Sequence, residues 1–95
     1  MGAKLLFRVL TPQGERFKGE CDAVDLWVTD DAAGNGGGSM GILPGHIPAV
    51  AALAEGGRVK AVDGGNTVYS ARVRGGYARV DRESVTVLTP EVMGE

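Results

Sequence analysis

Hydrophobic and polar residues alternate along several short segments of the chain, and this two-residue period is typical of β-strands with one buried face. From Lys4 to Leu10, the side chains of Leu5, Phe7 and Val9 fall on the same face. The following Thr11-Pro12-Gln13-Gly14 has proline and glycine at turn-forming positions. The pattern therefore predicts a first strand that ends in a hairpin turn.

A second alternating pattern extends from Glu15 to Val28, which is long for one strand. Gly19 interrupts this pattern, and we expect a bend or bulge at that glycine. Beyond the bend, the alternation predicts two faces, with Val24, Leu26 and Val28 on one and Cys21, Ala23, Asp25 and Trp27 on the other.

The clearest hairpin lies in the second half of the chain. It consists of Arg58–Asp63 and Thr67–Val73, joined by a turn at Gly64-Gly65-Asn66. Two more short strands are expected over Tyr77–Val80 and Ser84–Thr89, because valines alternate with polar residues in both segments.

Two segments are harder to interpret from local pattern. Thr29 to Gly38 is rich in glycine and has no apolar residue larger than alanine, so we expect a loop there. Ala49 to Glu55 has good helix propensity, but it follows Pro48 and could form only about two helical turns. We therefore predict a strand for Ala49 to Glu55.

Composition supports one all-β domain over residues 1–95. Sixteen glycines and four prolines interrupt the chain too often for a long helix, and 43% of the residues are hydrophobic. Eight or more short strands favour two packed sheets or a flattened barrel, since either arrangement buries one face of every strand.

Charge and cysteine content narrow the classes of partner. Ten basic and twelve acidic residues give a formal net charge of −2, and neither sign forms a block, so a nucleic-acid surface is not expected. Cys21 is the only cysteine, and we expect an inert packing residue with a thiol pKa raised by Glu20 and Asp22. No apolar run approaches the ~20 residues that span a bilayer, and no secretory signal is evident, which favours a reducing cytoplasmic setting.

Candidate chemical motifs are few. Gly36 to Gly41 matches G-x-G-x-x-G, but Pro44 follows too soon for the helix that would hold a phosphate. His46 and Cys21 are too few to form a Cys/His metal site, and no nucleophile accompanies the histidine. We predict no catalytic site, metal or cofactor, and a protein contact is the better interpretation of His46, which prolines frame.

The turn from Gly41 to Pro48, together with four other segments in the same order along the chain, resembles one known family. This family is the epsilon subunit of the F-type ATP synthase, called delta in mitochondria, and the resemblance concerns its N-terminal domain. The resemblance implies a flattened β-sandwich of about ten strands, with a strand at Ala49–Glu55. The matching segments besides the turn are Leu10-Thr11-Pro12, Phe17-Lys18-Gly19-Glu20, Gly75-Gly76-Tyr77-Ala78-Arg79-Val80 and Val85-Thr86-Val87-Leu88.

The resemblance implies a non-catalytic subunit of the rotating central stalk, which binds the gamma subunit and the c ring and couples proton transport to ATP synthesis. By this resemblance, Thr11, His46 and Ala51 match positions close to gamma, while Ser39 and Met40 match positions facing the c ring. The expected location is peripheral, on the cytoplasmic face of the cell membrane, without direct insertion. The free domain is expected to be a monomer or a weak dimer.

Two departures from the family pattern accompany the match. Gly38-Ser39-Met40-Gly41 stands where family members commonly carry Gly-Glu-Leu-Gly, so the acidic residue is missing, and Asp30 or Asp31 are the candidates to replace it. The sequence stops at Glu95, so the C-terminal helical hairpin of bacterial members, which inhibits ATP hydrolysis, is expected to be absent.

One alternative from another class stays open. A free-standing β-sandwich that binds a small ligand or carries a modified lysine would have a similar strand pattern. A carrier needs its lysine at a hairpin tip, and the turn at Gly64-Gly65-Asn66 has none.

Overall fold

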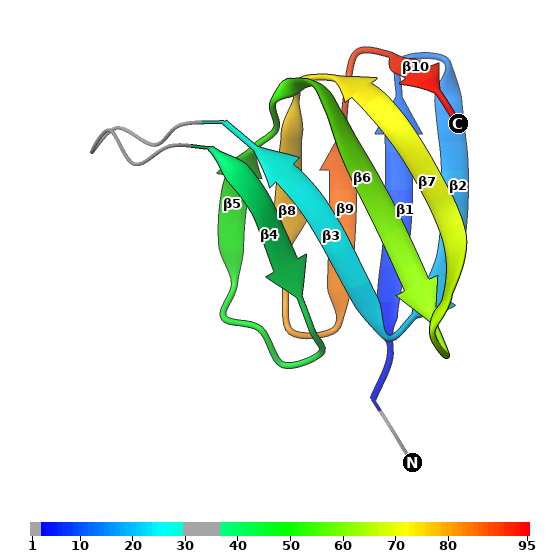
Figure 1. The fold of residues 1–95 in the computed structure, drawn as a ribbon, viewed down its shortest axis with the longest axis vertical. Helices are drawn as coiled ribbons and strands as arrows, with labels where there is room; N and C mark the ends of the chain where they lie inside the picture. The colour runs from blue at the N-terminus through cyan, green and yellow to red at the C-terminus, as the bar shows by residue number, and fades with distance from the viewer. Residues whose placement is uncertain (1–2, 30–36) are drawn as a thin grey trace.

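The computed structural model describes residues 3–29 and 37–95, and it contains ten strands and no helix in this part of the chain. The strands form two five-stranded sheets packed face to face (Figure 1), which confirms the predicted β-sandwich. The strands are β1 Leu5–Thr11, β2 Gly14–Cys21, β3 Ala23–Val28, β4 Gly38–Ile42, β5 Ala49–Ala52, β6 Glu55–Asp63, β7 Asn66–Arg74, β8 Tyr77–Val80, β9 Ser84–Leu88 and β10 Val92–Gly94.

Sheet A has the strand order β2-β1-β9-β8-β5, and sheet B has the order β10-β7-β6-β3-β4. Strands β1 and β9 pair in parallel, with Phe7 opposite Val85 and Val9 opposite Val87. All other pairs of described strands are antiparallel. Along the chain, β1 and β2 lie in sheet A, β3 and β4 in sheet B, β5 in sheet A, β6 and β7 in sheet B, β8 and β9 in sheet A, and β10 in sheet B. The chain therefore crosses between the two layers several times.

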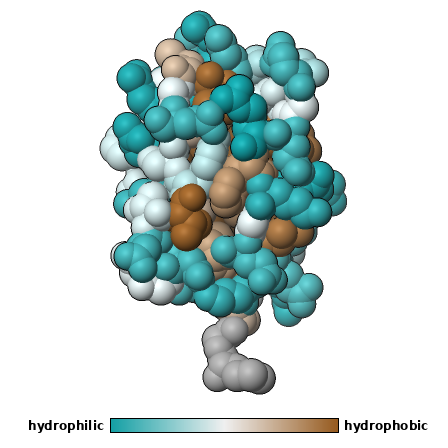
Figure 2. Space-filling view, turned by 90° about the vertical axis from the view of Figure 1, so that its right-hand side faces the viewer, coloured by the Kyte–Doolittle hydropathy of each residue, from teal (hydrophilic) through white to brown (hydrophobic). Residues whose placement is uncertain are grey.

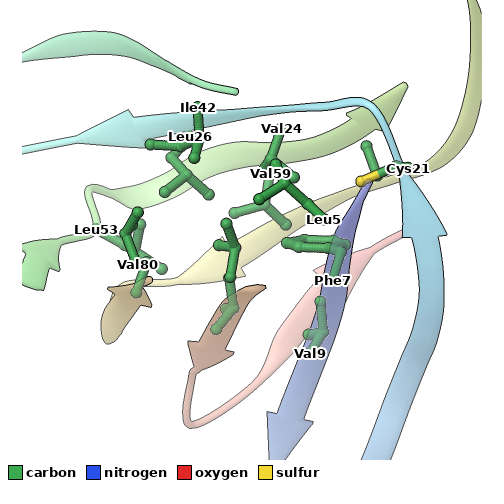
Figure 3. Packing of buried hydrophobic residues seen from close by; sticks show 14 of the residues in the cluster. Leu5, Phe7, Val9, Cys21, Val24, Leu26, Ile42, Leu53, Val59 and Val80 are labelled. Carbon is green, nitrogen blue, oxygen red and sulfur yellow. The ribbon is translucent and has the colours of Figure 1, made fainter. Parts of the chain in front are cut away.

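The core lies between the sheets and follows from the alternation along each strand. Leu5, Phe7 and Val9 of β1 are fully buried, as the pattern predicts. Figure 3 shows these side chains pointing from one sheet toward Val24 and Val59 of the other. Burial of one face per strand removes apolar surface from water and stabilises the sandwich.

The β6–β7 hairpin confirms the clearest sequence prediction. Its turn consists of Gly64 and Gly65, whose φ angles of 59° and 82° suit the type I′ turn of two-residue hairpins. Asn66 already belongs to β7 and pairs with Asp63, so the predicted turn was one residue too long.

The predicted bend at Gly19 is wrong. Gly19 lies within β2 and pairs with Phe7, and the chain instead changes sheets at Asp22. The backbone N–H of Asp22 donates to Val62 of sheet B, and its carboxylate accepts a hydrogen bond from the N–H of Gly64. Because the chain crosses between sheets here, Cys21 is buried and does not share the outward face of Trp27.

The harder segments are partly resolved by the fold. Ala49–Ala52 is strand β5, which confirms the preference for strand over helix, and β6 already begins at Glu55.

The predicted loop from Thr29 to Gly38 is described only at its ends. Gly38 begins β4, and residues 30–36, with Asp30 and Asp31, lie outside the described residues. No helix follows the G-x-G-x-x-G match, because Gly38–Ile42 is strand. Neither β4, where the pattern predicted a loop followed by a turn, nor the short β10 was predicted as a strand.

The edge of the sandwich formed by β2, β7 and β10 contains an aromatic cluster. The ring centroids of Phe7 and Phe17 are 5.9 Å apart, and those of Phe7 and Tyr69 are 6.3 Å apart. In Figure 2 apolar surface runs down the middle of this edge between hydrophilic side chains. Here the core reaches the surface.

Candidate interaction surfaces

The turn around His46 is fixed by hydrogen bonds at one end of the sandwich. The N–H of Gly45 donates to the carbonyl of Arg82 at 2.8 Å, which ties this turn to the one between β8 and β9. The N–H of His46 donates to the carbonyl of Leu43 at 3.1 Å, and the ring Nδ1 lies 2.7 Å from the carbonyl oxygen of Ile47. The exposed Leu43 and Ile47 are thus held on an ordered turn.

The outer face of sheet A carries a row of apolar side chains. Strand pairing aligns Ala52 with Tyr77, Tyr77 with Leu88, and Leu88 with Leu10. The side chains of Tyr77 and Leu88 are 60% and 49% exposed, so this row, here called the apolar row, lies largely in contact with water. Exposed apolar patches of this kind mark interaction surfaces in soluble domains.

A shallow groove continues the apolar row past the end of β1. It has a volume of about 380 Å³. Its lining residues are Leu10, Thr11, Pro12, Leu88, Thr89 and Pro90. The groove and the row form one nearly continuous surface.

The three residues expected near gamma all lie in sheet A or its loops, but at different places. Thr11 ends β1 beside the groove, and its hydroxyl donates to the carbonyl of Gly14 and accepts from the N–H of Gln13. His46 belongs to the connection between β4 and β5. Figure 1 shows this connection at the end of the sandwich opposite the turn between β1 and β2. Ala51 pairs with the buried Ala78, so its side chain points between the sheets rather than onto the apolar row.

The two residues expected near the c ring are neighbours on β4 with opposite directions. Ser39 is exposed and pairs with Trp27. Met40 pairs with Leu26 and packs against the core. Of the two, Ser39 is the residue that presents its side chain outward.

Sequence reasoning missed the apolar row and the exposed Val50 of β5, which is 70% exposed. A signal was present, because Val85 and Val87 share one face of β9, so Leu88 must lie on the other. The alignment of Leu88 with Tyr77 and Leu10 depends on strand order, which the sequence alone does not specify.

Within the described residues, neither pKa shifts nor metal-ligating side chains add a further candidate site to these surfaces. Burial raises the pKa of the Cys21 thiol, and its charged neighbours Asp63 and Asp22 contribute less to this increase. Across residues 3–29 and 37–95, His, Cys, Asp and Glu side chains do not gather in groups of three that could hold a metal ion. The same residues contain no helix able to cross a membrane.

Comparison with known proteins gives consistent matches. The family model described as "ATP synthase, Delta/Epsilon chain, beta-sandwich domain" matches residues 4–94. An ATP synthase epsilon chain from Frankia casuarinae is 36% identical over 80 residues, covering 84% of this chain and 85% of that protein. An ATP synthase epsilon chain from a Synechococcus species is 42% identical over 84 residues, covering 88% of this chain and 55% of that protein.

The fold also matches a solved structure. A chain in the mitochondrial ATP synthase of Euglena gracilis, in a structure described as OSCP/F1/c-ring, superposes with a TM-score of 0.75 at 21% identity. The match covers 99% of this chain and 55% of that one, so this chain spans about half the length of several proteins that it resembles. Since the family model spans almost all of the described fold and a relative of similar length is 36% identical, the chain belongs to the family of ATP synthase delta/epsilon chain β-sandwich domains.

Proposed function

We propose that this domain is a non-catalytic rotor subunit of an F-type ATP synthase, bound to the gamma subunit through the outer face of sheet A. It also contacts the c ring through the outward side of β4, near Ser39. In this role it couples proton transport to ATP synthesis as a peripheral component on the cytoplasmic face of the membrane. The observation that carries the proposal is the apolar row, on a domain of the delta/epsilon family.

The size of the surface fits this role. A stable protein interface buries roughly 600 to 1,000 Å² on each partner. The domain exposes 5498 Å² in total, so the lower figure is about a tenth of its surface, which one sheet face can supply. Tyr77 and Leu88 at the centre of such an interface would lose their contact with water, which favours binding.

Charges beside the apolar row add specificity to the surface. Arg79 shares the outer face with Val50, its partner on β5, and Arg8 forms an ion pair with Glu15 at 3.2 Å. Charged side chains at the rim of an interface steer association and set orientation more than they add affinity. We therefore assign binding energy to the apolar row and orientation to the arginines.

Co-expression with the cognate gamma subunit, followed by size-exclusion chromatography, tests the proposal. The wild-type domain should co-elute with gamma, and Tyr77→Asp should elute apart because it places a charge in the apolar row. Val68→Asp is the matched control, since Val68 is an exposed valine of sheet B, 43% accessible. A His46→Asp variant reports separately on the turn.

Two results would contradict the proposal. A folded wild-type domain that elutes apart from gamma refutes the gamma assignment. Equal co-elution of Tyr77→Asp and wild type refutes the assignment of the apolar row. An intact mass with a lysine adduct would instead favour a carrier module.

A further inference from the structure

The tip of the β6–β7 hairpin contains a chemically reactive pair, Asp63 followed by Gly64. Glycine has no side chain to hinder approach to its backbone nitrogen, so aspartate or asparagine before glycine readily forms a cyclic imide. The sequence has one other pair of this kind, Asn35-Gly36, which lies outside the described residues. Asp63 and Gly64 are therefore the reactive pair whose surroundings the structure describes.

The reaction joins the side chain of Asp63 to the main chain. The backbone nitrogen of Gly64 attacks Cγ of Asp63, a C–N bond forms, and the C–O bond to the hydroxyl of the protonated carboxyl breaks. This hydroxyl leaves as water together with the amide hydrogen. Water then opens the imide, either at the side-chain carbonyl, which regenerates aspartate, or at the main-chain carbonyl, which leaves isoaspartate with its Cβ inserted into the main chain.

The attacking nitrogen is held by Asp22, the residue at which the chain changes sheets. The N–H of Gly64 donates to the carboxylate Oδ2 of Asp22 at 2.9 Å. The backbone N–H of Asp22 donates to the carbonyl of Val62, also at 2.9 Å. Asp22 thus binds the hairpin on both sides of Asp63. The peptide between Asp63 and Gly64 has to rotate before its nitrogen reaches Cγ, and this rotation breaks the hydrogen bond to Asp22.

The carboxylate under attack is held by a second contact. Oδ1 of Asp63 forms an ion pair with Nζ of Lys4, and strand pairing aligns Asp63 with Asn66. Both reacting groups are therefore engaged by other residues while the hairpin is closed. The side chain of Asp63 is still partly exposed, so the water that opens the imide has access to it.

We propose that Asp63 is a site of spontaneous isomerisation to isoaspartate, and that Asp22 and Lys4 suppress the reaction while the hairpin is closed. Hairpin ends open locally more often than a whole domain unfolds, and the reaction proceeds from this open form. In isoaspartate the free carboxylate is attached directly to Cα, on a shorter arm. The modified residue therefore loses its contact with Lys4 and its regular pairing with Asn66.

Peptide mapping by liquid chromatography and mass spectrometry tests the proposal, after incubation of the folded protein at neutral pH. Trypsin cleaves after Lys60 and Arg72, so one peptide, residues 61–72, reports on Asp63 alone of the two reactive pairs. Isoaspartate changes the retention and fragmentation of this peptide but not its mass, and the imide lacks one water. Asp63→Glu should remove these products, because its longer side chain does not form the imide readily.

The diagnostic variant is Asp22→Ala, which removes the acceptor of the Gly64 N–H. We expect isoaspartate to accumulate about fivefold faster than in wild type, the factor that corresponds to the loss of one hydrogen bond. Asp22→Asn is the matched control, because its amide oxygen still accepts this hydrogen bond, and its rate should stay within about twofold of wild type.

The contact with Lys4 is tested in the same way. Lys4→Ala should raise the rate by about twofold, since exposed ion pairs contribute little. Lys18→Ala, which changes an exposed cation of β2, should leave the rate unaltered.

A further variant separates local opening from loss of global stability. Gly14→Ala strains the turn between β1 and β2, where φ is 127°, without changing the contacts of Asp63. Its rate should rise less than that of Asp22→Ala, and circular dichroism verifies that each variant is folded.

Three results would overturn the proposal. If wild type unfolded in urea forms no isoaspartate in peptide 61–72, Asp63 is not a reactive site. If Asp22→Ala and wild type react at the same rate, Asp22 does not protect the site. If Gly14→Ala accelerates the reaction as much as Asp22→Ala does, global unfolding rather than the contacts of the hairpin controls it.

Discussion

The ring of Phe17 in sheet A stacks on the ring of Tyr69 in sheet B, with centroids 4.5 Å apart and planes inclined by 22°. This contact joins the two sheets at the edge formed by β2 and β7. Phe7 lies beneath both rings and is fully buried. The stack therefore covers the core where the sandwich would otherwise open to water.

Replacing Phe17 by alanine should destabilise the domain by about 2 kcal/mol, less than for a fully buried phenylalanine because Phe17 is only partly buried. Phe17→Leu should lose less, since it keeps most of the apolar volume. Urea unfolding of both variants measures these differences. Equal stability of Phe17→Ala and wild type would show that the stack contributes nothing.

Gly76 should be intolerant of any side chain. A Cβ at this position would lie 2.1 Å from the carbonyl oxygen of Leu88, and its φ angle is 105°. Gly14 is the matched control, because its φ angle is 127° but a Cβ there would meet nothing within 4 Å. We expect Gly14→Ala to cost ~1 to 3 kcal/mol from backbone strain and Gly76→Ala to cost clearly more.

Thermal unfolding of the two alanine variants checks this prediction. Similar melting temperatures would mean that the contact with Leu88 relaxes easily. A larger loss for Gly76→Ala would explain why a glycine, and not another turn residue, directly precedes β8.

The Cys21 thiol should react slowly with disulfide reagents in the folded protein. Burial shields its sulfur and raises its pKa above the ordinary value of 9.0, so little thiolate forms at neutral pH. Because Cys21 is the only cysteine, a single colorimetric trace reports on it. The rate should rise sharply in urea, and a fast reaction without denaturant would contradict the observed burial.

The Glu95 carboxylate gives a testable pH dependence. Hydrogen bonds from Arg16 and then from Tyr69 hold the pKa of Glu95 below its ordinary value of 4.5. A lowered pKa in the folded state means that the stabilisation is present above 4.5 and is lost as the pH falls through the folded-state pKa. The melting temperature of Glu95→Gln should therefore approach that of wild type in acid, whereas a constant difference would contradict the linkage.

Much of the strand pattern could be predicted from local alternation, but the change of sheet could not. Leu5, Phe7 and Val9 are buried as their spacing indicates. The crossing at Asp22 depends on hydrogen bonds with Val62 and Gly64, which lie about forty residues away in sequence. Gly19 was the stronger local signal, and the distant contacts outweighed it.

The candidate surfaces divide in the same way. The turn around His46 could be found because prolines and glycines leave a local signature. The apolar row depends on strands β5, β8, β9 and β1 lying side by side. Such lateral neighbours are set by topology, so their residues could not be grouped in advance.

The parallel pairing of β1 with β9 has a consequence for synthesis of the chain. Strand β1 lies between β2 and β9, so it must wait for Ser84–Leu88 to be synthesised before both of its edges are paired. Contacts between such distant segments form slowly, because the intervening chain has to be ordered first. We therefore expect the domain to fold only after Ser84–Leu88 has left the ribosome, with β1 exposed to chaperones until then.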